Sequence, residues 1–134
     1  MLSTGHQAGS FAVIGGIGFL VDGGILTILH SIYDLELLPA RIASFSAAVT
    51  VTWFLNRQRT FAGSKDTKLV NEWGRYAAVN SVGSILNMAI FFWLVARYEL
   101  LARIPLVPLG IAASIALIFN FLASKYLVFR HQQS

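Results

Sequence analysis

The chain has 134 residues, of which 56% are hydrophobic and 12% are charged, and its formal net charge is +4 at pH 7. Soluble domains are about 45–50% apolar and about 25% charged, so this composition excludes an ordinary water-soluble domain and indicates a membrane protein. The chain contains no cysteine, which excludes disulfides and thiol chemistry.

Four long apolar runs follow one another along the chain. The first, from Phe11 to Leu29, has Asp22 as its single charged residue, and the other three runs, 42–55, 76–96 and 104–124, have none. About 20 apolar residues cross a bilayer, and soluble helices rarely stay uncharged on all sides. We therefore predict an all-α, polytopic membrane protein with four transmembrane helices, at about 9–31, 39–58, 75–96 and 105–126. The first Lys or Arg is Arg41, so we expect the first run to be a retained span and not a signal peptide.

The basic residues are distributed unequally between the two predicted sides of the membrane. One side carries Arg57, Arg59, Lys65, Lys68, Arg75, Lys125 and Arg130. The other side carries Arg41, Arg97 and Arg103, mixed with acidic residues. Because Lys and Arg concentrate on the cytoplasmic side, both termini are expected to face the cytoplasm. The same bias explains the basic balance of the chain, which is therefore no indication of a nucleic-acid partner.

The chain also repeats itself. A shift of 65 residues lays FAVIGGIGFLVDGGI, which starts at Phe11, over YAAVNSVGSILNMAI, which starts at Tyr76. After a three-residue insertion the correspondence continues through the second helix of each half. The paired positions include Gly18 with Gly83, Asp22 with Asn87, Arg57 with Lys125 and Phe61 with Phe129. We predict one domain, 1–134, built from two parallel helical-hairpin repeats at about 9–61 and 75–129, related by a pseudo-twofold axis along the membrane normal.

The glycine-rich stretch from Gly15 to Gly24 allows two interpretations, phosphate binding or helix packing. A phosphate-binding G-x-G-x-x-G loop follows a strand, whereas here Val21 stands where the third glycine belongs and the context is a membrane helix. Small residues in membrane helices instead let backbones approach closely. We therefore assign helix packing to the small residues Ala8, Ala12, Gly15, Gly16, Gly18 and Gly83.

Polar residues inside the first and third predicted helices form a possible central seam. Asp22 lies where a charge costs about 2.5–3.5 kcal/mol on the insertion scale, and its repeat partner Asn87 shares a helix face with Asn80. Membrane-buried acids are functional candidates by default, which favours binding of a substrate or a proton. The alternative is an interhelical hydrogen bond or a snorkelling carboxylate that only holds the bundle together.

Cations close the second and fourth predicted helices. Arg57 and Arg59 follow Asn56 at the end of the second helix, and Lys125 occupies the equivalent place in the fourth. For each residue alone, anchoring at the interface is the simpler interpretation. Together they would form a cytoplasmic mouth suited to a phosphate, which an arginine can bind in bidentate fashion.

Nothing in the sequence indicates catalysis. His6, His30 and His131 are dispersed, without metal-ligand spacing to one another or to the acids. No serine stands in a recognisable nucleophile context. We therefore expect no enzymatic activity, no metal and no cofactor.

Four segments in order resemble the GtrA-like family, small four-helix membrane proteins of cell-envelope polysaccharide synthesis. These segments are FAVIGGIGFLVD from Phe11, FLNRQRTF from Phe54, EWGRYAAV from Glu72 and YLVF from Tyr126. The most specific piece is N-R-x-x-T-F, and the resemblance extends from about Phe11 to Phe129. The second repeat departs from the first, with Ser124 and Lys125 where Asn56 and Arg57 stand, so the two halves are expected to bind any ligand unequally.

The resemblance implies a role with polyprenyl-phosphate-linked sugars in the bacterial cytoplasmic membrane. Such a protein would move the lipid from the cytoplasmic to the outer leaflet, where a membrane-bound glycosyltransferase uses the sugar. The residues assigned to substrate binding by hypothesis are Asp22, Asn80, Asn87, Asn56, Arg57, Arg59 and Lys125.

Two other functions remain open. In the first, the protein is a scaffold that recruits the glycosyltransferase and transports nothing, with a partner surface at Ala8, Ala12 and Gly16. In the second, it is a small proton-coupled multidrug exporter, although such exporters typically carry Glu in the first helix and lack this parallel repeat. Because four short helices leave little space for a sugar path, we expect a homodimer.

Overall fold

The computed structural model describes residues 3–62 and 68–129, so Lys65, Arg130 and His131 lie outside the described residues. Every regular element within these residues is a helix. Four segments are long and apolar enough to cross a membrane: Thr4–Ile32, Leu37–Thr60, Leu69–Arg97 and Leu106–Val128. The predicted all-α architecture with four candidate membrane spans is confirmed.

The spans are built from α-helices, three of which end in a π-helical turn. The first half contains α1 (Thr4–Thr27), η1 (Ile28–Ile32), α2 (Leu37–Leu55) and η2 (Asn56–Thr60). The second half contains α3 (Leu69–Arg97), the short α4 (Glu99–Arg103), α5 (Leu106–Ala123) and η3 (Ser124–Val128). Helix α1 starts earlier than predicted because the Ser3 hydroxyl caps it, accepting a hydrogen bond from the His6 backbone N–H at 3.2 Å.

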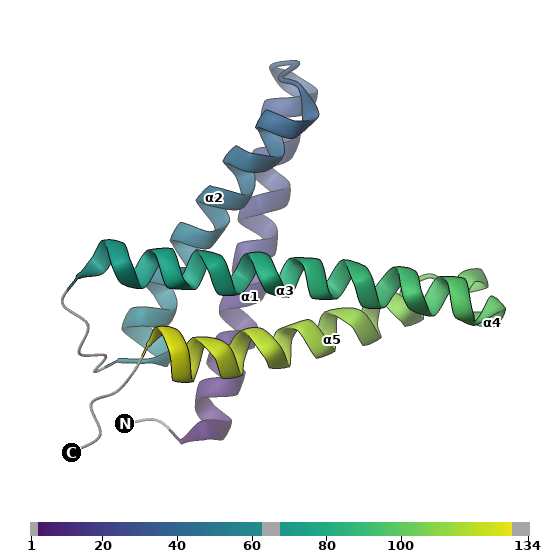
Figure 1. Ribbon diagram of the computed structural model, residues 1–134. Coiled ribbons are helices and arrows are strands. Elements are labelled where there is room, and N and C mark those ends of the chain that lie inside the picture. The colour runs from purple at the N-terminus through teal and green to yellow at the C-terminus, as the bar shows by residue number, and fades with distance from the viewer. Residues whose placement is uncertain (1–2, 63–67, 130–134) are drawn as a thin grey trace.

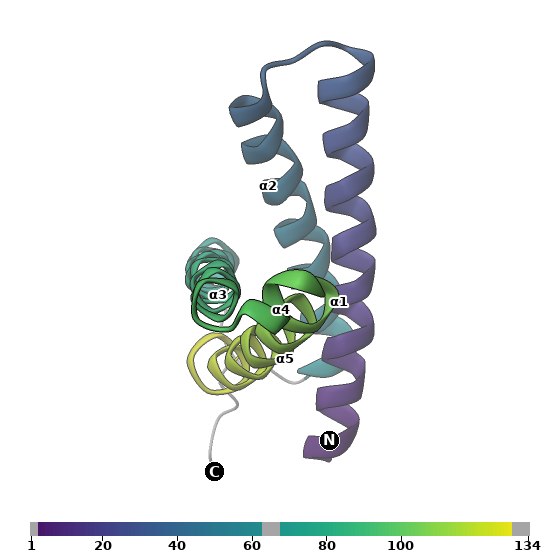
Figure 2. The ribbon, with the colours of Figure 1, turned by 90° about the vertical axis from the view of Figure 1, so that its right-hand side faces the viewer.

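Each hairpin consists of two helices packed along each other, α1 with α2 and α3 with α5. The α1–α2 hairpin crosses the α3–α5 hairpin (Figure 1). In the turned view the second hairpin is seen nearly end-on while the first lies in the plane (Figure 2), so the crossing is steep. The two hairpins therefore diverge from the region where they cross.

The starts of α1 and α3 meet the ends of η2 and η3 at one end of the molecule. Lys125 Nζ donates a hydrogen bond to Thr4 Oγ1 at 2.9 Å, and the Ser10 and Thr60 hydroxyls share one at 2.6 Å. The Arg75 guanidinium donates to two backbone carbonyls of η3, at 3.2 and 3.3 Å. The first and last spans thus begin and end together, as an even number of spans requires. That this common end faces the cytoplasm stays a prediction from the basic residues.

An aromatic cluster fills this common end. The Phe61 and Phe129 rings stack with centroids 4.9 Å apart and an interplanar angle of 14°. Phe11 meets Phe61 edge-on at 6.2 Å, and Tyr76 meets Phe129 edge-on at 5.7 Å. All four side chains are buried. The predicted repeat pairs Phe11 with Tyr76 and Phe61 with Phe129. The contact of Phe11 with Phe61 in the first half therefore has its counterpart in the contact of Tyr76 with Phe129 in the second half.

Candidate functional site

A cavity of about 440 Å³ lies between the two hairpins, and all four long helices line it. This volume falls in the range of small-molecule sites, about 300–1,000 Å³. Its polar lining residues are Asp22, Thr52, Asn56, Tyr76, Asn80, Ser84, Asn87 and Asn120. Aromatic rings of Phe11, Phe19 and Phe45 stand beside them. Four of the seven predicted binding residues, Asp22, Asn56, Asn80 and Asn87, are therefore brought together here.

The side chains of Asn56 and Tyr76 belong to a buried hydrogen-bond network at one border of the cavity. Asn56 Nδ2 donates to the Tyr76 hydroxyl at 3.0 Å, and Thr60 Oγ1 donates to Asn56 Oδ1 at 2.8 Å. Tyr76 and Phe11 line the cavity and also belong to the aromatic cluster. The cluster therefore borders the cavity on the side of the common end. Both Nδ2 and Oδ1 of Asn56 are therefore hydrogen-bonded to other side chains of the protein.

Two glycines that were predicted to pack sit directly under polar side chains of the neighbouring helix. A Cβ atom at Gly18 would lie 2.4 Å from Thr52 Cγ2, and one at Gly83 would lie 2.0 Å from Asn120 Oδ1. The repeat pairs Gly18 with Gly83 and Thr52 with Asn120. At these two positions, only glycine permits the observed approach of α1 to α2 and of α3 to α5.

The other small residues predicted to pack are open in the described chain. A Cβ atom at Gly15 or Gly16 would meet no described atom within 4 Å, and both residues line the cavity. Ala12 also lines the cavity, and both Ala8 and Ala12 are exposed. Any packing partner of these four residues would have to come from outside the described chain, so their packing role stays a prediction.

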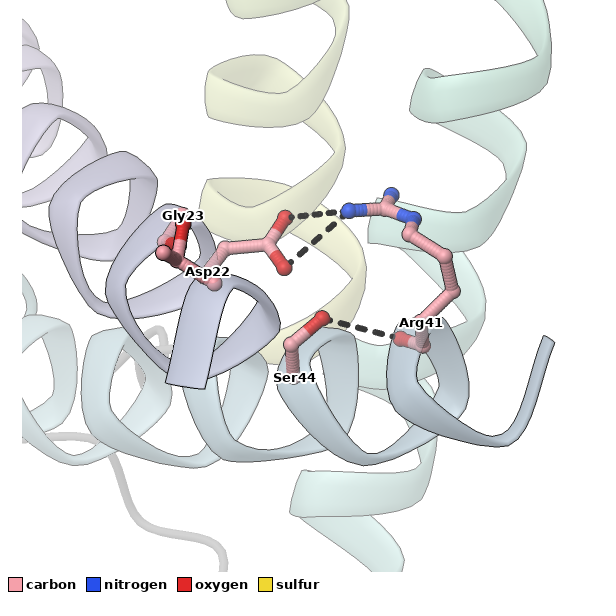
Figure 3. A network of polar contacts seen from close by, with 5 residues as sticks. Asp22, Gly23, Arg41 and Ser44 are labelled. Carbon is pink, nitrogen blue, oxygen red and sulfur yellow. Dashed lines mark hydrogen bonds and ion pairs between the residues drawn. The ribbon is translucent and has the colours of Figure 1, made fainter. Parts of the chain in front are cut away.

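Asp22 forms an ion pair with Arg41 of the same hairpin. Arg41 Nη1 donates to both carboxylate oxygens at 3.2 Å, and the two side chains are 47% (Arg41) and 23% (Asp22) exposed. Figure 3 shows the Arg41 side chain extending from α2 toward the Asp22 carboxylate on α1, with Ser44 on α2 below the pair. In the sequence, Arg41 counted only as a charge on the outer side. Its partnership depends on how α1 and α2 lie side by side, for which the sequence carried no direct signal.

The predicted cationic mouth lies outside the cavity. Arg57 is paired with Glu72, a fully buried carboxylate that also accepts a hydrogen bond from Trp53 Nε1 at 3.0 Å. Arg57, Arg59 and Lys125 do not line the cavity. Glu72 was not predicted as a partner of Arg57, although the acid lies within the EWGR segment. The structure therefore does not bring the three cations to the predicted polar seam.

Two residues of the cavity, Thr52 and Asn120, were not among the predicted site residues. The repeat pairs them, and each lies over the tightly packed glycine of its own hairpin described above. Asn120 Oδ1 is buried without a hydrogen-bond partner among the described residues. A search for polar residues paired by the repeat in the second and fourth helices would have found them.

Comparison with known families agrees with this architecture. The family model of the GtrA/DPMS transmembrane domain matches residues 10–129. A search of curated proteins found no matching relative. The family match covers the second, third and fourth candidate spans and the first from residue 10 on, and it confirms the resemblance to the GtrA-like family. The chain therefore belongs to the GtrA/DPMS transmembrane domain family, which associates it with membrane processes that use polyprenyl-linked sugars.

Proposed function

We propose that the protein moves a polyprenyl-phosphate-linked sugar from the cytoplasmic to the outer leaflet of the bacterial cytoplasmic membrane, for glycosylation of cell-surface polysaccharide. The observation that carries the proposal is the cavity of about 440 Å³ between the hairpins. A polar group moved into hydrocarbon without a hydrogen bond costs about 2–7 kcal/mol. The amides of Asn80 and Asn87 and the Asp22 carboxylate offer hydrogen bonds to sugar hydroxyls at membrane depth.

The shape of the molecule suits a ligand with a polar head and a long apolar tail. The hairpins diverge from the cavity, and their outer faces expose large apolar side chains. A prenyl chain can stay among the lipid tails beside these faces while the sugar occupies the cavity. Transport then requires that only the head group passes through the protein across the membrane.

A homodimer and a membrane-bound glycosyltransferase are the partners we propose. The support for a close helix contact is the exposed stripe of Ala8, Ala12 and Gly16 on α1. Small side chains let membrane helices approach one another, and the space above Gly16 is empty of described atoms within 4 Å.

The decisive experiment fills the cavity without disturbing the fold. Gly15 lines the cavity, and a Cβ atom there would meet no described atom within 4 Å, so Leu at this site should enter the cavity without a clash. Gly9→Leu is the matched control, since Gly9 lies on the same helix, is equally open and does not line the cavity. Purified variants would be reconstituted with a labelled polyprenyl-phosphate sugar, and an impermeant reagent would report the lipid that reaches the outer leaflet.

If the protein transports the sugar lipid, the impermeant reagent should gain access to the inner-leaflet lipid at the same rate with the wild-type protein and with Gly9→Leu. Gly15→Leu should slow this exposure by about tenfold or more, because the head group loses its binding space. If the wild-type protein fails to accelerate exposure, or if the two leucine variants behave alike, the proposal is wrong.

The second candidate function is a scaffold that anchors the glycosyltransferase and transports nothing. The observation in its favour is that Arg57 and Lys125 are engaged by other residues and do not line the cavity. A scaffold should tolerate Gly15→Leu and lose cellular glycosylation with Ala8→Leu, since Ala8 is exposed on α1 and does not line the cavity. Transport through the cavity instead predicts that Gly15→Leu also loses cellular glycosylation, so this variant separates the two functions.

A further inference from the structure

We propose that Arg41 is a phosphate-binding residue at the rim of the cavity, and that Asp22 is its counter-ion while the site is empty. The ligand class is a lipid phosphate, and its polyprenyl tail is taken from the proposed function, on which the inference rests. The site would lie at the end of the spans away from the chain termini, where the lipid would leave a cytoplasm-to-outside transporter.

Arg41 lies where a lipid-linked sugar phosphate needs a cation, near the space that would hold the sugar. Asp22 lines the cavity, and Arg41 is bonded to Asp22, so the guanidinium lies one hydrogen bond from the cavity wall. Arg57, Arg75 and Lys125 instead contact Glu72, the η3 carbonyls and Thr4 at the common end. None of these three cations lines the cavity.

Arg41 also leaves part of its hydrogen-bonding capacity open. Both contacts with Asp22 use the single nitrogen Nη1. Nε and Nη2 donate no hydrogen bond within residues 3–62 and 68–129, and the side chain is 47% exposed. Two parallel N–H donors on one edge of a guanidinium match two oxygens of a phosphate. Arg41 can therefore bind a phosphate through this edge.

The Arg41–Asp22 ion pair leaves room for a second anion. Both distances are 3.2 Å, longer than the 2.7–2.9 Å of strong charge-assisted hydrogen bonds. A phosphate can therefore share the guanidinium through its open edge while Asp22 stays in place, and the pair keeps the cation neutralised in the empty site.

The Arg41–Asp22 pair has no equivalent in the second hairpin. The repeat pairs Asp22 with Asn87 and, after the three-residue insertion, Arg41 with Leu109. The second hairpin therefore offers an amide and an aliphatic side chain at the equivalent positions, and neither supplies a cation for a phosphate. This asymmetry agrees with the expectation that the two halves bind a ligand unequally.

The experiment measures the affinity of the purified full chain for a short prenyl phosphate, farnesyl monophosphate, in lipid nanodiscs. Farnesol is the comparison without a phosphate, inorganic phosphate is the comparison without a tail, and phosphatidylglycerol is the competitor that represents ordinary anionic lipid. Arg41→Leu, which installs the residue of the second hairpin, should weaken farnesyl phosphate binding about tenfold or more and leave farnesol binding unchanged. Arg103→Leu is the matched control, because Arg103 is exposed on α4, where it pairs with Glu99 and does not line the cavity.

Asp22→Asn gives the sharpest readout, because the two single variants should change affinity in opposite directions. Removing the resting counter-ion frees the guanidinium, so Asp22→Asn should tighten farnesyl phosphate binding by about threefold. A purely structural ion pair would instead lower affinity in both variants. The double variant Asp22→Asn with Arg41→Leu keeps the site neutral and should still bind more weakly than the wild-type protein, because it has no guanidinium.

Several results would overturn the inference: equal affinities of Arg41→Leu and the wild-type protein, weaker binding by Asp22→Asn, or full competition by phosphatidylglycerol or inorganic phosphate. Failure of the proposed transport looks different. There, the proteoliposome assay shows no exposure of the sugar lipid although farnesyl phosphate binding still depends on Arg41. Transport that persists in Arg41→Leu, together with unchanged affinity, contradicts the phosphate site and leaves the proposed function standing.

Discussion

Replacing Gly18 by alanine should destabilise the first hairpin, although alanine is the better helix former. The added Cβ would lie 2.4 Å from the Thr52 methyl carbon Cγ2. Thr52 cannot easily turn away, because its hydroxyl donates to the Ala48 and Val49 carbonyls at 2.9 and 3.1 Å. Helices α1 and α2 must then move apart or Thr52 must give up these bonds.

The magnitude follows from two opposing terms. Overpacking a tight contact costs about 1–3 kcal/mol, whereas replacing Gly by Ala within a helix gains up to about 1 kcal/mol. We therefore expect Gly18→Ala to lower the free energy of unfolding by about 1–2 kcal/mol. Gly16→Ala is the matched control on the same helix, where a Cβ meets no described atom within 4 Å, and it should be neutral or slightly stabilising.

The assay is unfolding in mixed micelles with increasing SDS, followed by the loss of helical circular dichroism. Thr52→Ser removes the obstructing methyl group and keeps the hydroxyl, so it should restore most of the stability lost in Gly18→Ala. The two single variants and the double variant form a cycle that isolates this contact. Equal stabilities of Gly18→Ala and Gly16→Ala, or no rescue by Thr52→Ser, would refute the reasoning.

Two further predictions use the same unfolding assay. Arg57→Leu should lower the free energy of unfolding by about 3 kcal/mol or more, because the fully buried Glu72 loses a cation. Arg103→Leu breaks an exposed ion pair and should change the free energy of unfolding by less than about 0.5 kcal/mol. Comparable losses in the two variants would show that the Arg57–Glu72 pair does not stabilise the fold. Asn56→Leu should cost about 2 kcal/mol, since the buried Tyr76 and Thr60 hydroxyls lose their partner, while Asn87→Leu, at an amide with no hydrogen bond among the described residues, should be nearly neutral. An Asn87 variant as unstable as the Asn56 variant would count against the network.

Hydropathy, which is a local property, was enough to predict the four spans. About 20 apolar residues must be helical in a bilayer whatever they pack against, so Phe11 to Leu29 could be assigned without a fold. The starts of α1 and α3 could not be placed in this way. The first turn of α3 carries the buried Glu72, a charged residue that hydropathy does not assign to a membrane span, although an acid is favourable at the start of a helix.

The sequence by itself also predicted which positions of the two halves correspond, and that Asp22, Asn80 and Asn87 lie along one polar seam, and all three line the cavity. Partners across the helices were decided only by the tertiary structure. Asp22 meets Arg41, and Arg57 meets Glu72, because of how the helices lie against one another. In a membrane, lipid tails are as apolar as leucine, so a hydrophobic pattern does not specify which face of a helix meets another helix. The crossing of the hairpins, and the cavity it leaves, therefore depend on close contacts such as Gly18 with Thr52 and on polar pairs.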